Sequence, residues 1–417
     1  MKERAYHDLE NEGGVASVAS VEIGVASDKR SGTRDEGRWY RRPAALIAAG
    51  AIVAAGAIVG TLAGTFGYAW LTSMHGRPPE FEMAAAKDGA VVDMAAAFPP
   101  GRFDVKAEGD ALSFLVVGDW GRDGQHGQRE VAHSMAAVAS HPDVRPDFVI
   151  SVGDNFYVGG LFGVDDPQFD TSFVEMYTAT ALQVPWLAVL GNMDYGDDGG
   201  CGKPREQEDV SCLSAEKVRT RSPDHQLSPA LRRKDWRWLA GRYFTVSPRP
   251  DVDLIFVDTS PLIAEYANYT WAHEVRGGIA EQDTQAQMAF LERALARGAK
   301  EVNRTRIVVG HHPVYSNGFR GGHAELAGRF GPLFDEHGVK AYICGHDHDL
   351  QHLSVGNTEY VISGAGSKAG RGFGGQQHTS FQYDGSGFAW VRVDAEGAIV
   401  LTFYDAGGVK LYERSIA

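Results

Sequence analysis

Cysteine is scarce in this chain, which has only three among its 417 residues. Three cysteines form too few disulfides to stabilise a fold of this length, so their number alone does not show whether the chain resides in an oxidising or a reducing compartment. Positive charge is also in deficit, since 54 acidic residues against 40 Lys and Arg leave a formal net charge of -14. Because a protein needs a basic face to release counterions from nucleic acid, this balance argues against a nucleic-acid partner. We also find no internal repeat.

The chain does contain an ordinary supply of core-forming residues, with 43% hydrophobic and 10% aromatic residues. This composition is typical of a folded protein. The length would allow two or three domains, but large α/β enzymes often use about 250 to 300 residues for a single fold. We therefore expect one large domain with appendages, and we place that domain at residues 109–417.

The beginning of the chain differs from the rest. Residues 1–43 mix small residues with charges of both signs and show no helical or strand period, so we interpret them as a disordered tail. Residues 44–71 follow, twenty-eight positions without one charged side chain. Such a run can cross a hydrocarbon core of about 30 Å and is too long for the apolar part of a signal peptide. It predicts a transmembrane helix, with a buried Ala-rich helix as the alternative.

The flanks of this span predict its orientation. Only Arg77 and Lys87 lie close behind the span, whereas six basic residues precede it: Lys29, Arg30, Arg34, Arg38, Arg41 and Arg42. The tail should therefore face the cytoplasm, and the signal-anchored domain should lie outside the cell or in a lumen, as in a single-pass type II membrane protein. Residues 72–108 are predicted to be a stalk. Glycosylation sequons at Asn268 and Asn303 are compatible with this side of the membrane.

From Ser113 onward, short apolar runs that end in glycine or polar residues predict buried strands. These runs are SFLVVGD, DFVISVGD, PWLAVLGN, VDLIFVD, TRIVVGHH and VKAYICGHDH. Residues 125–140 and 282–296 lie between such runs and carry apolar residues at helical spacing. Alternating strands and helices predict a layered α/β domain. Near the C-terminus, the segments YVISGAG, GFAWVRVD and IVLTFYD predict additional antiparallel strands.

Five of these strands end in residues of metal-binding type, at the edge where open α/β sheets place their ligand sites. Asp119 and Asp154 follow two of the strands, and each alone is equally well explained as a helix or turn cap. Tyr157 alone would more often be a packing residue. A carboxylate and a phenolate three residues apart, however, suit one hard cation such as ferric iron.

The remaining strand ends supply an amide and imidazoles. Asn192 alone is usually a turn residue, and His311 alone is structural about as often as functional. His346 and His348 alternate with Asp347 directly after a strand, so that an extended backbone would point both imidazoles to one side. The whole ordered set offers enough ligands for two adjacent metals that share one bridging carboxylate.

The motifs GDWG, GDNFY, GN, GHHPVYS and GHDH, in this order, resemble those of the calcineurin-like metallophosphoesterases. They resemble most specifically the small, mammalian-type purple acid phosphatases, the tartrate-resistant form. The tyrosine after GDN is the specific feature, because most relatives without the purple iron site lack it. The likeness covers roughly residues 110–417, since GHDHDLQHL and YVISGAG continue it.

The resemblance implies a four-layer α/β/β/α sandwich with a dinuclear metal site at one edge of its two sheets. It implies an acid phosphatase that hydrolyses phosphate monoesters, small molecules or phosphoproteins, with a metal-activated hydroxide. The implied ligands are Asp119, Tyr157 and His348 for Fe(III), Asn192, His311 and His346 for Fe2+, Zn2+ or Mn2+, and Asp154 for both. The predicted catalytic residues are Asp154, Asn192, His311 and His323.

One position departs from the family pattern, since Met193 stands where the family carries a histidine. A methionine cannot donate a proton, which weakens the expectation of turnover but not that of metal binding. His312 and His323 are further candidates for contact with the substrate. Two other interpretations stay open: a metallophosphodiesterase or nucleotide hydrolase, against which Tyr157 argues, and a metal-binding surface protein with weakened catalysis, which Met193 motivates.

The cysteines also carry predictions. Cys201 and Cys212 bracket part of a long, charged connection, and in an oxidising compartment we expect them to form a disulfide, with two unpaired thiols as the alternative. Cys344 ends a buried strand and is predicted to be an inert core thiol rather than a ligand. The sequence predicts no oligomeric state.

Overall fold

The computed structural model describes residues 86–197, 220–269, 271–297 and 304–416. Several predicted features lie outside these ranges: the tail 1–43, the span 44–71, the stalk up to residue 85, Asn303, and the cysteines Cys201 and Cys212. Within the described ranges, no helix combines the length and the apolar character that a membrane crossing requires.

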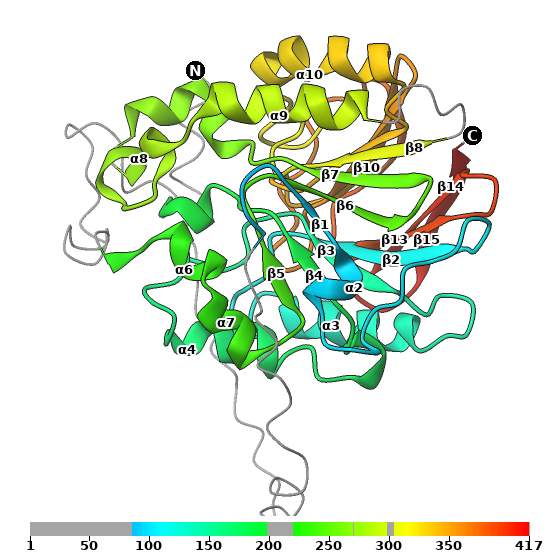
Figure 1. Ribbon diagram of the computed structural model, residues 1–417, viewed down its shortest axis with the longest axis horizontal. Coiled ribbons are helices and arrows are strands. Elements are labelled where there is room, and N and C mark those ends of the chain that lie inside the picture. The colour runs from blue at the N-terminus through cyan, green and yellow to red at the C-terminus, as the bar shows by residue number, and fades with distance from the viewer. Residues whose placement is uncertain (1–85, 198–219, 270, 298–303, 417) are drawn as a thin grey trace, which may run out of the picture. The chain divides into compact units, whose positions relative to one another are not determined.

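Two β-sheets form the centre of the fold (Figure 1). The eight-stranded sheet has the spatial order β1 (Ala90–Val92), β6 (Phe244–Arg249), β7 (Val252–Phe256), β8 (Thr305–Val309), β9 (Ala341–Cys344), β11 (Thr358–Ser363), β10 (Leu350–Val355) and β12 (Thr379–Tyr383). The seven-stranded sheet has the order β15 (Lys410–Ile416), β14 (Ile399–Asp405), β13 (Gly387–Val393), β2 (Leu112–Val117), β3 (Phe148–Ser151), β4 (Trp186–Ala188) and β5 (Trp238–Ala240).

Each sheet has a parallel centre. In the eight-stranded sheet, β7, β8 and β9 run parallel, with Leu254 opposite Ile307 and Ile307 opposite Ala341. In the seven-stranded sheet, β2, β3 and β4 run parallel in the same way. The antiparallel strands predicted near the C-terminus are present, because β13 pairs with β2 and with β14. Parallel strands bring their carboxyl ends to one edge of each sheet, where ligand sites of α/β proteins lie.

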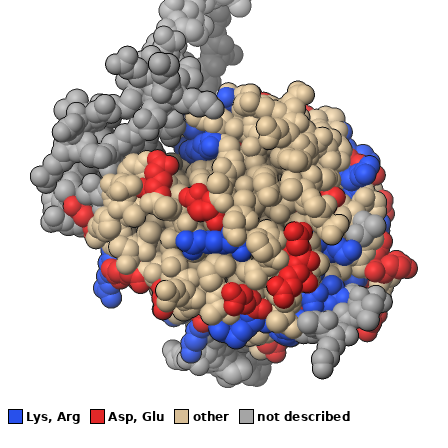
Figure 2. Space-filling model, turned by 90° about the horizontal axis from the view of Figure 1, so that it is seen from above, with Lys and Arg blue, Asp and Glu red and all other residues tan. Residues whose placement is uncertain are grey.

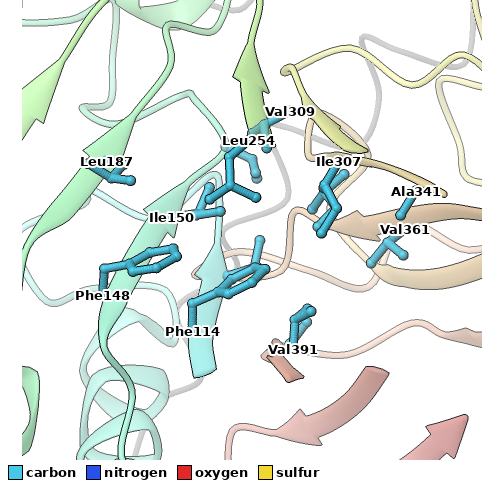
Figure 3. Close-up of a cluster of buried hydrophobic side chains, with 14 of the residues drawn as sticks. Phe114, Phe148, Ile150, Leu187, Leu254, Ile307, Val309, Ala341, Val361 and Val391 are labelled. Atoms are coloured by element: carbon cyan, nitrogen blue, oxygen red, sulfur yellow. The ribbon is translucent and has the colours of Figure 1, made fainter. Parts of the chain in front are cut away.

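Alternating side chains bury both faces of each sheet, as the continuous apolar runs predicted. In β2, Phe114 and Val116 belong to the core between the sheets, whereas Leu115 and Val117 pack on the opposite face. Figure 3 shows the core between the sheets, where Phe114 stacks on Phe148 at a centroid distance of 5.0 Å. Because each central strand has two apolar faces, each sheet requires a further layer on its outer side.

Helices supply those outer layers. The α9 (Thr284–Ala296) and α10 (Ala324–His337) helices cover the eight-stranded sheet, and α3 (Gln128–Ala139) covers the other (Figure 1). The helices predicted at 125–140 and 282–296 are thereby confirmed as α3 and α9. Shorter helices complete the fold: α2 (Met94–Ala97), α4 (Pro167–Phe169), α6 (Pro223–Leu227), α7 (Pro229–Lys234) and α8 (Trp271–Glu274). The described domain thus has two sheets between two helical layers.

The surface of this domain carries charges of both signs. Figure 2, which looks from above onto the side of α9 and α10, shows acidic and basic side chains interspersed among uncharged ones.

Local signals in the sequence fix the ends of α9 and α10. The Asp283 carboxylate accepts a hydrogen bond from the Ala286 amide and begins α9, and Gly338 adopts a left-handed conformation where α10 ends.

The folded domain begins earlier than the sequence predicted. Residues 90–92, which were assigned to the stalk, form β1 and pair in parallel with β6. Met94 and Phe98 then enter the core between the sheets, with exposed fractions of 2% and 1%. The stalk prediction for 72–108 is therefore corrected from residue 86 onward. A strand of only three residues, between Gly89 and Asp93, carries too weak a periodic signal to be recognised in sequence.

Candidate metal centre

All seven predicted ligands lie just beyond the carboxyl ends of parallel strands. Asp119, Asp154 and Asn192 follow β2, β3 and β4 of one sheet, and His311, His346 and His348 follow β8 and β9 of the other. Tyr157 lies in the same connection as Asp154. Every one of these side chains is buried, with exposed fractions between 0% and 7%. The adjoining edges of the two sheets therefore bring the whole set together.

The first group of ligand atoms surrounds the Tyr157 hydroxyl. Its oxygen lies 2.8 Å from Asp154 Oδ2, 3.1 Å from Asp119 Oδ1 and 3.2 Å from His348 Nε2. His348 Nε2 also lies 3.3 Å from Asp119 Oδ1. Two carboxylates, a phenol and an imidazole thus point into one small volume, and this combination of oxygen and nitrogen donors suits a hard trivalent cation.

The second group surrounds the Asn192 carbonyl oxygen. This oxygen lies 3.0 Å from His346 Nδ1 and 3.2 Å from His311 Nε2. His311 Nε2 in turn lies 3.3 Å from Asp154 Oδ1 and 3.3 Å from His346 Nδ1. Neutral amide and imidazole donors with one carboxylate suit a divalent transition metal.

Asp154 belongs to both groups, because its Oδ2 faces Tyr157 and its Oδ1 faces His311. The spacing fits bound metal ions, since ligand atoms at right angles and about 2.1 Å from an ion lie about 3.0 Å from one another. Asp119, Asp154 and His311 also meet the spacing of a metal-binding cluster. The donor set therefore accommodates two adjacent ions that share the Asp154 carboxylate.

Unusual backbone conformations aim three of these side chains. Asp119, Asp154 and His346 have φ values of 59°, 50° and 70°, in the left-handed region that residues with a side chain seldom adopt. Backbone strain of this kind costs on the order of 1–3 kcal/mol and persists where surrounding structure enforces it, often at functional sites. Each of these residues follows a strand within three positions, so the turn redirects its side chain into the site.

Glycines of the motifs allow the ligands to approach the backbone. A Cβ atom on Gly191 would lie 2.1 Å from Asp154 Oδ1, and a Cβ atom on Gly345 would lie 2.5 Å from Asp119 Oδ2. Any other residue would displace a carboxylate. The glycines in LGN and CGHDH are therefore required by close packing against the two acidic ligands.

A buried carboxylate that we did not single out in the sequence holds the two acidic loops together. Asp194 accepts hydrogen bonds from the Gly191 amide at 2.8 Å, the Asn155 amide at 2.9 Å and the Gln226 side chain at 2.7 Å. Burial, with the nearby charge of Asp154, raises the pKa of Asp194 to about 7. Its bonds tie the residue after Asp154 to the residue before Asn192, so Asp194 positions ligands of both groups. Its place two residues after Asn192 is the only sequence signal of this role.

The electrostatics of the ligands favour a bound cation. Burial and the Asp154 charge raise the pKa of Asp119 well above its usual range, and burial raises that of Tyr157 in the same way. Burial lowers the pKa of His346 and His348 well below the usual range, so both imidazoles are neutral and able to bind a metal. A multivalent cation reverses the penalty on the anionic ligands, because it supplies the missing positive charge.

His312 is in the wrong place to touch a substrate. Its Nδ1 lies 2.8 Å from the Thr259 hydroxyl and its Nε2 lies 2.7 Å from the Tyr266 hydroxyl. Although its ring is close enough to His311 and His346 to group with them as a metal cluster, both of its nitrogens are engaged by hydroxyl groups. The structure therefore makes His312 a buried packing residue.

His323 lies directly before α10, and its ring packs 5.2 Å from His312 and 5.7 Å from His346, measured between centroids. Its Nε2 is buried and has no hydrogen-bond partner in the described part of the chain. His323 is thus adjacent to the ligand set without belonging to it.

Of the other predicted residues, Cys344 is buried, and burial raises the pKa of its thiol well above the usual range, in agreement with an inert role.

Two arginines near the ligands were missed by the sequence analysis. The Arg122 guanidinium lies over the Tyr157 ring at 3.5 Å from its centroid. Arg320 donates a hydrogen bond from Nη1 to the His346 carbonyl at 2.7 Å. Both lie in loops that follow ligand motifs, where the surrounding sequence shows no periodic pattern that could place them.

Comparison with known proteins agrees with this geometry. The family model of the calcineurin-like phosphoesterases matches residues 112–350. Purple acid phosphatase 7 of Arabidopsis thaliana is 37% identical over 322 residues, which cover 75% of this chain and 88% of that protein. This chain belongs to the purple acid phosphatases. The predicted family is thereby confirmed.

Other members and one solved structure extend the likeness. Tartrate-resistant acid phosphatase type 5 of Homo sapiens is 28% identical over 322 residues, covering 73% of this chain and 91% of that protein. A structure described as GAP50, the anchor in the inner membrane complex of Plasmodium, has a TM-score of 0.57 and 24% sequence identity, and the match covers 74% of this purple acid phosphatase and 89% of GAP50. The GAP50 match supports the fold.

Proposed function

We propose that this chain hydrolyses phosphate monoesters at a dinuclear metal centre. The observation that carries the proposal is the position of Asp154, whose two carboxylate oxygens face two separate groups of ligand atoms. Membership of the purple acid phosphatases supports the same conclusion. Two cations held side by side by these residues would supply the Lewis acidity that activates water and stabilises the charge of a transferring phosphoryl group.

We assign each ligand group to one type of ion. Asp119, Tyr157 and His348 are assigned to Fe(III), because a phenolate prefers this hard cation. Asn192, His311 and His346 are assigned to Fe2+, Zn2+ or Mn2+. The Val152 carbonyl accepts a hydrogen bond from His311 Nδ1 at 2.7 Å, which leaves Nε2 as the donor atom for the divalent ion.

The residues around the centre keep these ligands in place during the reaction. The Met193 amide donates to Asp154 Oδ1 at 2.9 Å. The Asp197 carboxylate accepts from Asn192 Nδ2 at 2.8 Å, which leaves the Asn192 carbonyl oxygen facing His311 and His346. We assign His323 as the candidate proton donor to the leaving group, since its Nε2 is buried beside His346 and no described group bonds to it. Proton transfer by a positioned side chain is worth about a hundred- to ten-thousand-fold in rate.

The test uses the full-length chain produced in a secretory host. We expect about two metal ions per chain, and hydrolysis of an aryl phosphate monoester that exceeds that of the corresponding diester. Faster hydrolysis of the diester would favour the phosphodiesterase interpretation. Two bound ions with no hydrolysis of either ester would favour the metal-binding surface protein that Met193 motivates.

We further propose that residues 44–71 anchor the phosphatase as a single-pass type II membrane protein. The support is the uncharged run and the six basic residues before it. Protease added outside intact cells should release an active domain. Without protease, only detergent should extract the full-length chain from the membrane. Release of the full-length chain by carbonate or salt would contradict an anchor.

A further inference from the structure

We propose that Arg320 is a phosphate-binding residue of this site and donates hydrogen bonds to phosphoryl oxygens, which Met193 cannot do. The proposal rests on the proposed phosphatase function and adds a residue to it. Met193 is 6% exposed and offers no strong hydrogen-bond donor. His312 is excluded because hydroxyl groups engage both of its nitrogens.

The geometry holds Arg320 at both ends. Its backbone amide donates to Asp347 Oδ1 at 2.8 Å, and its Nη1 donates to the His346 carbonyl at 2.7 Å. Nη1 also lies 3.4 Å from His346 Nδ1, the atom that faces Asn192. The GHDH segment that supplies two metal ligands therefore also fixes the guanidinium beside them, which reduces the rotamer entropy that binding would otherwise cost.

The charge count of the loaded centre calls for an anion. Asp119, Asp154 and an ionised Tyr157 contribute three negative charges, fewer than the combined charge of a ferric and a divalent ion. Arg320 and Arg122 add two positive charges beside them. A phosphate monoester dianion offsets part of this excess, and a guanidinium can donate two parallel hydrogen bonds to its oxygens.

Arginine would replace only part of what a histidine does. A guanidinium is always protonated in proteins and transfers no proton, so Arg320 binds the phosphoryl group without assisting the leaving group. Loss of Arg320 should therefore weaken phosphate affinity and raise KM, and leave the dependence of kcat on leaving-group pKa unchanged. Loss of a proton donor such as His323 should change that dependence instead.

The experiment measures binding of inorganic phosphate to the metal-loaded, full-length chain by calorimetry, together with metal content. Arg320→Ala should weaken phosphate binding by about ten- to a hundredfold, the range for hydrogen bonds to charged groups. The phosphate affinity of Arg320→Lys should lie between those of the unaltered chain and Arg320→Ala, because lysine keeps the charge and loses the two parallel hydrogen bonds of the guanidinium. The control is Arg329→Ala, which removes an exposed arginine of α10 outside the site.

The outcomes separate the alternatives. Phosphate affinity within twofold of the unaltered chain, with both metals retained, would overturn the proposal. Loss of metal from Arg320→Ala would also overturn it, since Arg320 would then only hold His346 in place through its carbonyl. If the unaltered chain binds phosphate through Arg320 but hydrolyses no ester, the proposed function fails and the phosphate site stands.

Discussion

The ligand floor and the rim of the site are built differently. The ligand floor comprises seven residues that are buried in the connections after strand ends: Asp119, Asp154, Tyr157, Asn192, His311, His346 and His348. The rim comprises Arg122, Arg320 and His323, which are half-exposed and lie in loops, with the more buried Met193 between rim and floor. The floor contains all seven predicted metal ligands, whereas the rim contains none, and Met193 stands where the family resemblance predicts a histidine.

This difference indicates that metal binding and substrate turnover are separable in the fold. The floor is specified by two sheets, by glycines such as Gly191 and by left-handed turns, so we expect most substitutions there to disturb metal binding. The rim residues lie in connections, which tolerate substitution because fewer backbone contacts depend on them. Changes in the floor should therefore remove metal and activity together, and changes in the rim should alter rates with the metals in place.

The largest effect should follow from Asp154→Ala. Because one carboxylate contacts both ligand groups, we expect loss of both ions and a fall in activity well beyond the roughly 10- to 100-fold effect typical of outer ligand partners. Metal analysis and an aryl phosphate assay measure the result. Asp143→Ala, which removes an exposed carboxylate, is the control. Two ions per chain in Asp154→Ala would contradict the shared role.

Tyr157→Phe tests whether the ligand group around Tyr157 and the ligand group around Asn192 bind their ions independently. If the phenolate binds Fe(III), the unaltered protein should have a broad charge-transfer band in visible light, and the substitution should abolish it while the divalent ion stays bound. Tyr177→Phe is a matched control, since Tyr177 is a fully buried core tyrosine that is not among the predicted ligands. A colourless protein with full iron occupancy would remove the purple assignment.

Sequence reasoning located the floor because strand ends are recognisable and each ligand follows one directly. Asp154 and Asn192 could be placed at one edge before any coordinates, since parallel strands share that edge. It could not place Arg320, because the loop from His311 to α10 has no period and its path depends on Asp347 accepting from the Arg320 amide. It missed β1 for a related reason, since a three-residue edge strand is stable only once β6 is beside it.

A buried carboxylate outside the ligand floor, Asp258, should make the stability of the folded protein depend on pH. Asp258 accepts a hydrogen bond from the Tyr195 hydroxyl, and burial raises its pKa from an ordinary 3.8 to about 7. Between these values the unfolded chain has lost the proton and the folded chain keeps it, so this group makes the folded state less stable as pH rises from about 4 to about 7. At about 1.36 kcal/mol per pKa unit, the total is at most roughly 4 kcal/mol.

Asp258→Asn removes this titration. Relative to the unaltered protein, the free energy of unfolding of the variant should increase as pH rises from about 4 to about 7. Above about pH 7 the difference between the two proteins should stay constant. Urea unfolding at several pH values measures the difference, in which other titrating groups cancel. A constant difference from about pH 4 to about pH 7 would show that Asp258 is ionised in the folded protein throughout.

The smallest change tests the boundary between floor and rim. Met193→His restores a proton donor beside Asn192, and the backbone amide that holds Asp154 Oδ1 is kept whichever side chain is present. We therefore expect unchanged metal content. The rate on alkyl phosphates should rise by about tenfold or more, because a poor alkoxide leaving group requires a proton. Activated aryl esters, which need less assistance, should gain less.

A matched Met193→Leu variant separates proton transfer from packing, since leucine fills a similar volume and donates nothing. It should leave both rates and their leaving-group dependence unchanged. Arg320 cannot mask the gain from the histidine, because a guanidinium binds the phosphoryl group without releasing a proton. If Met193→His changes neither rate, a donor is already present, and His323→Asn should then slow alkyl phosphates specifically. Slower hydrolysis in Met193→His with loss of metal would instead place Met193 within the ligand floor.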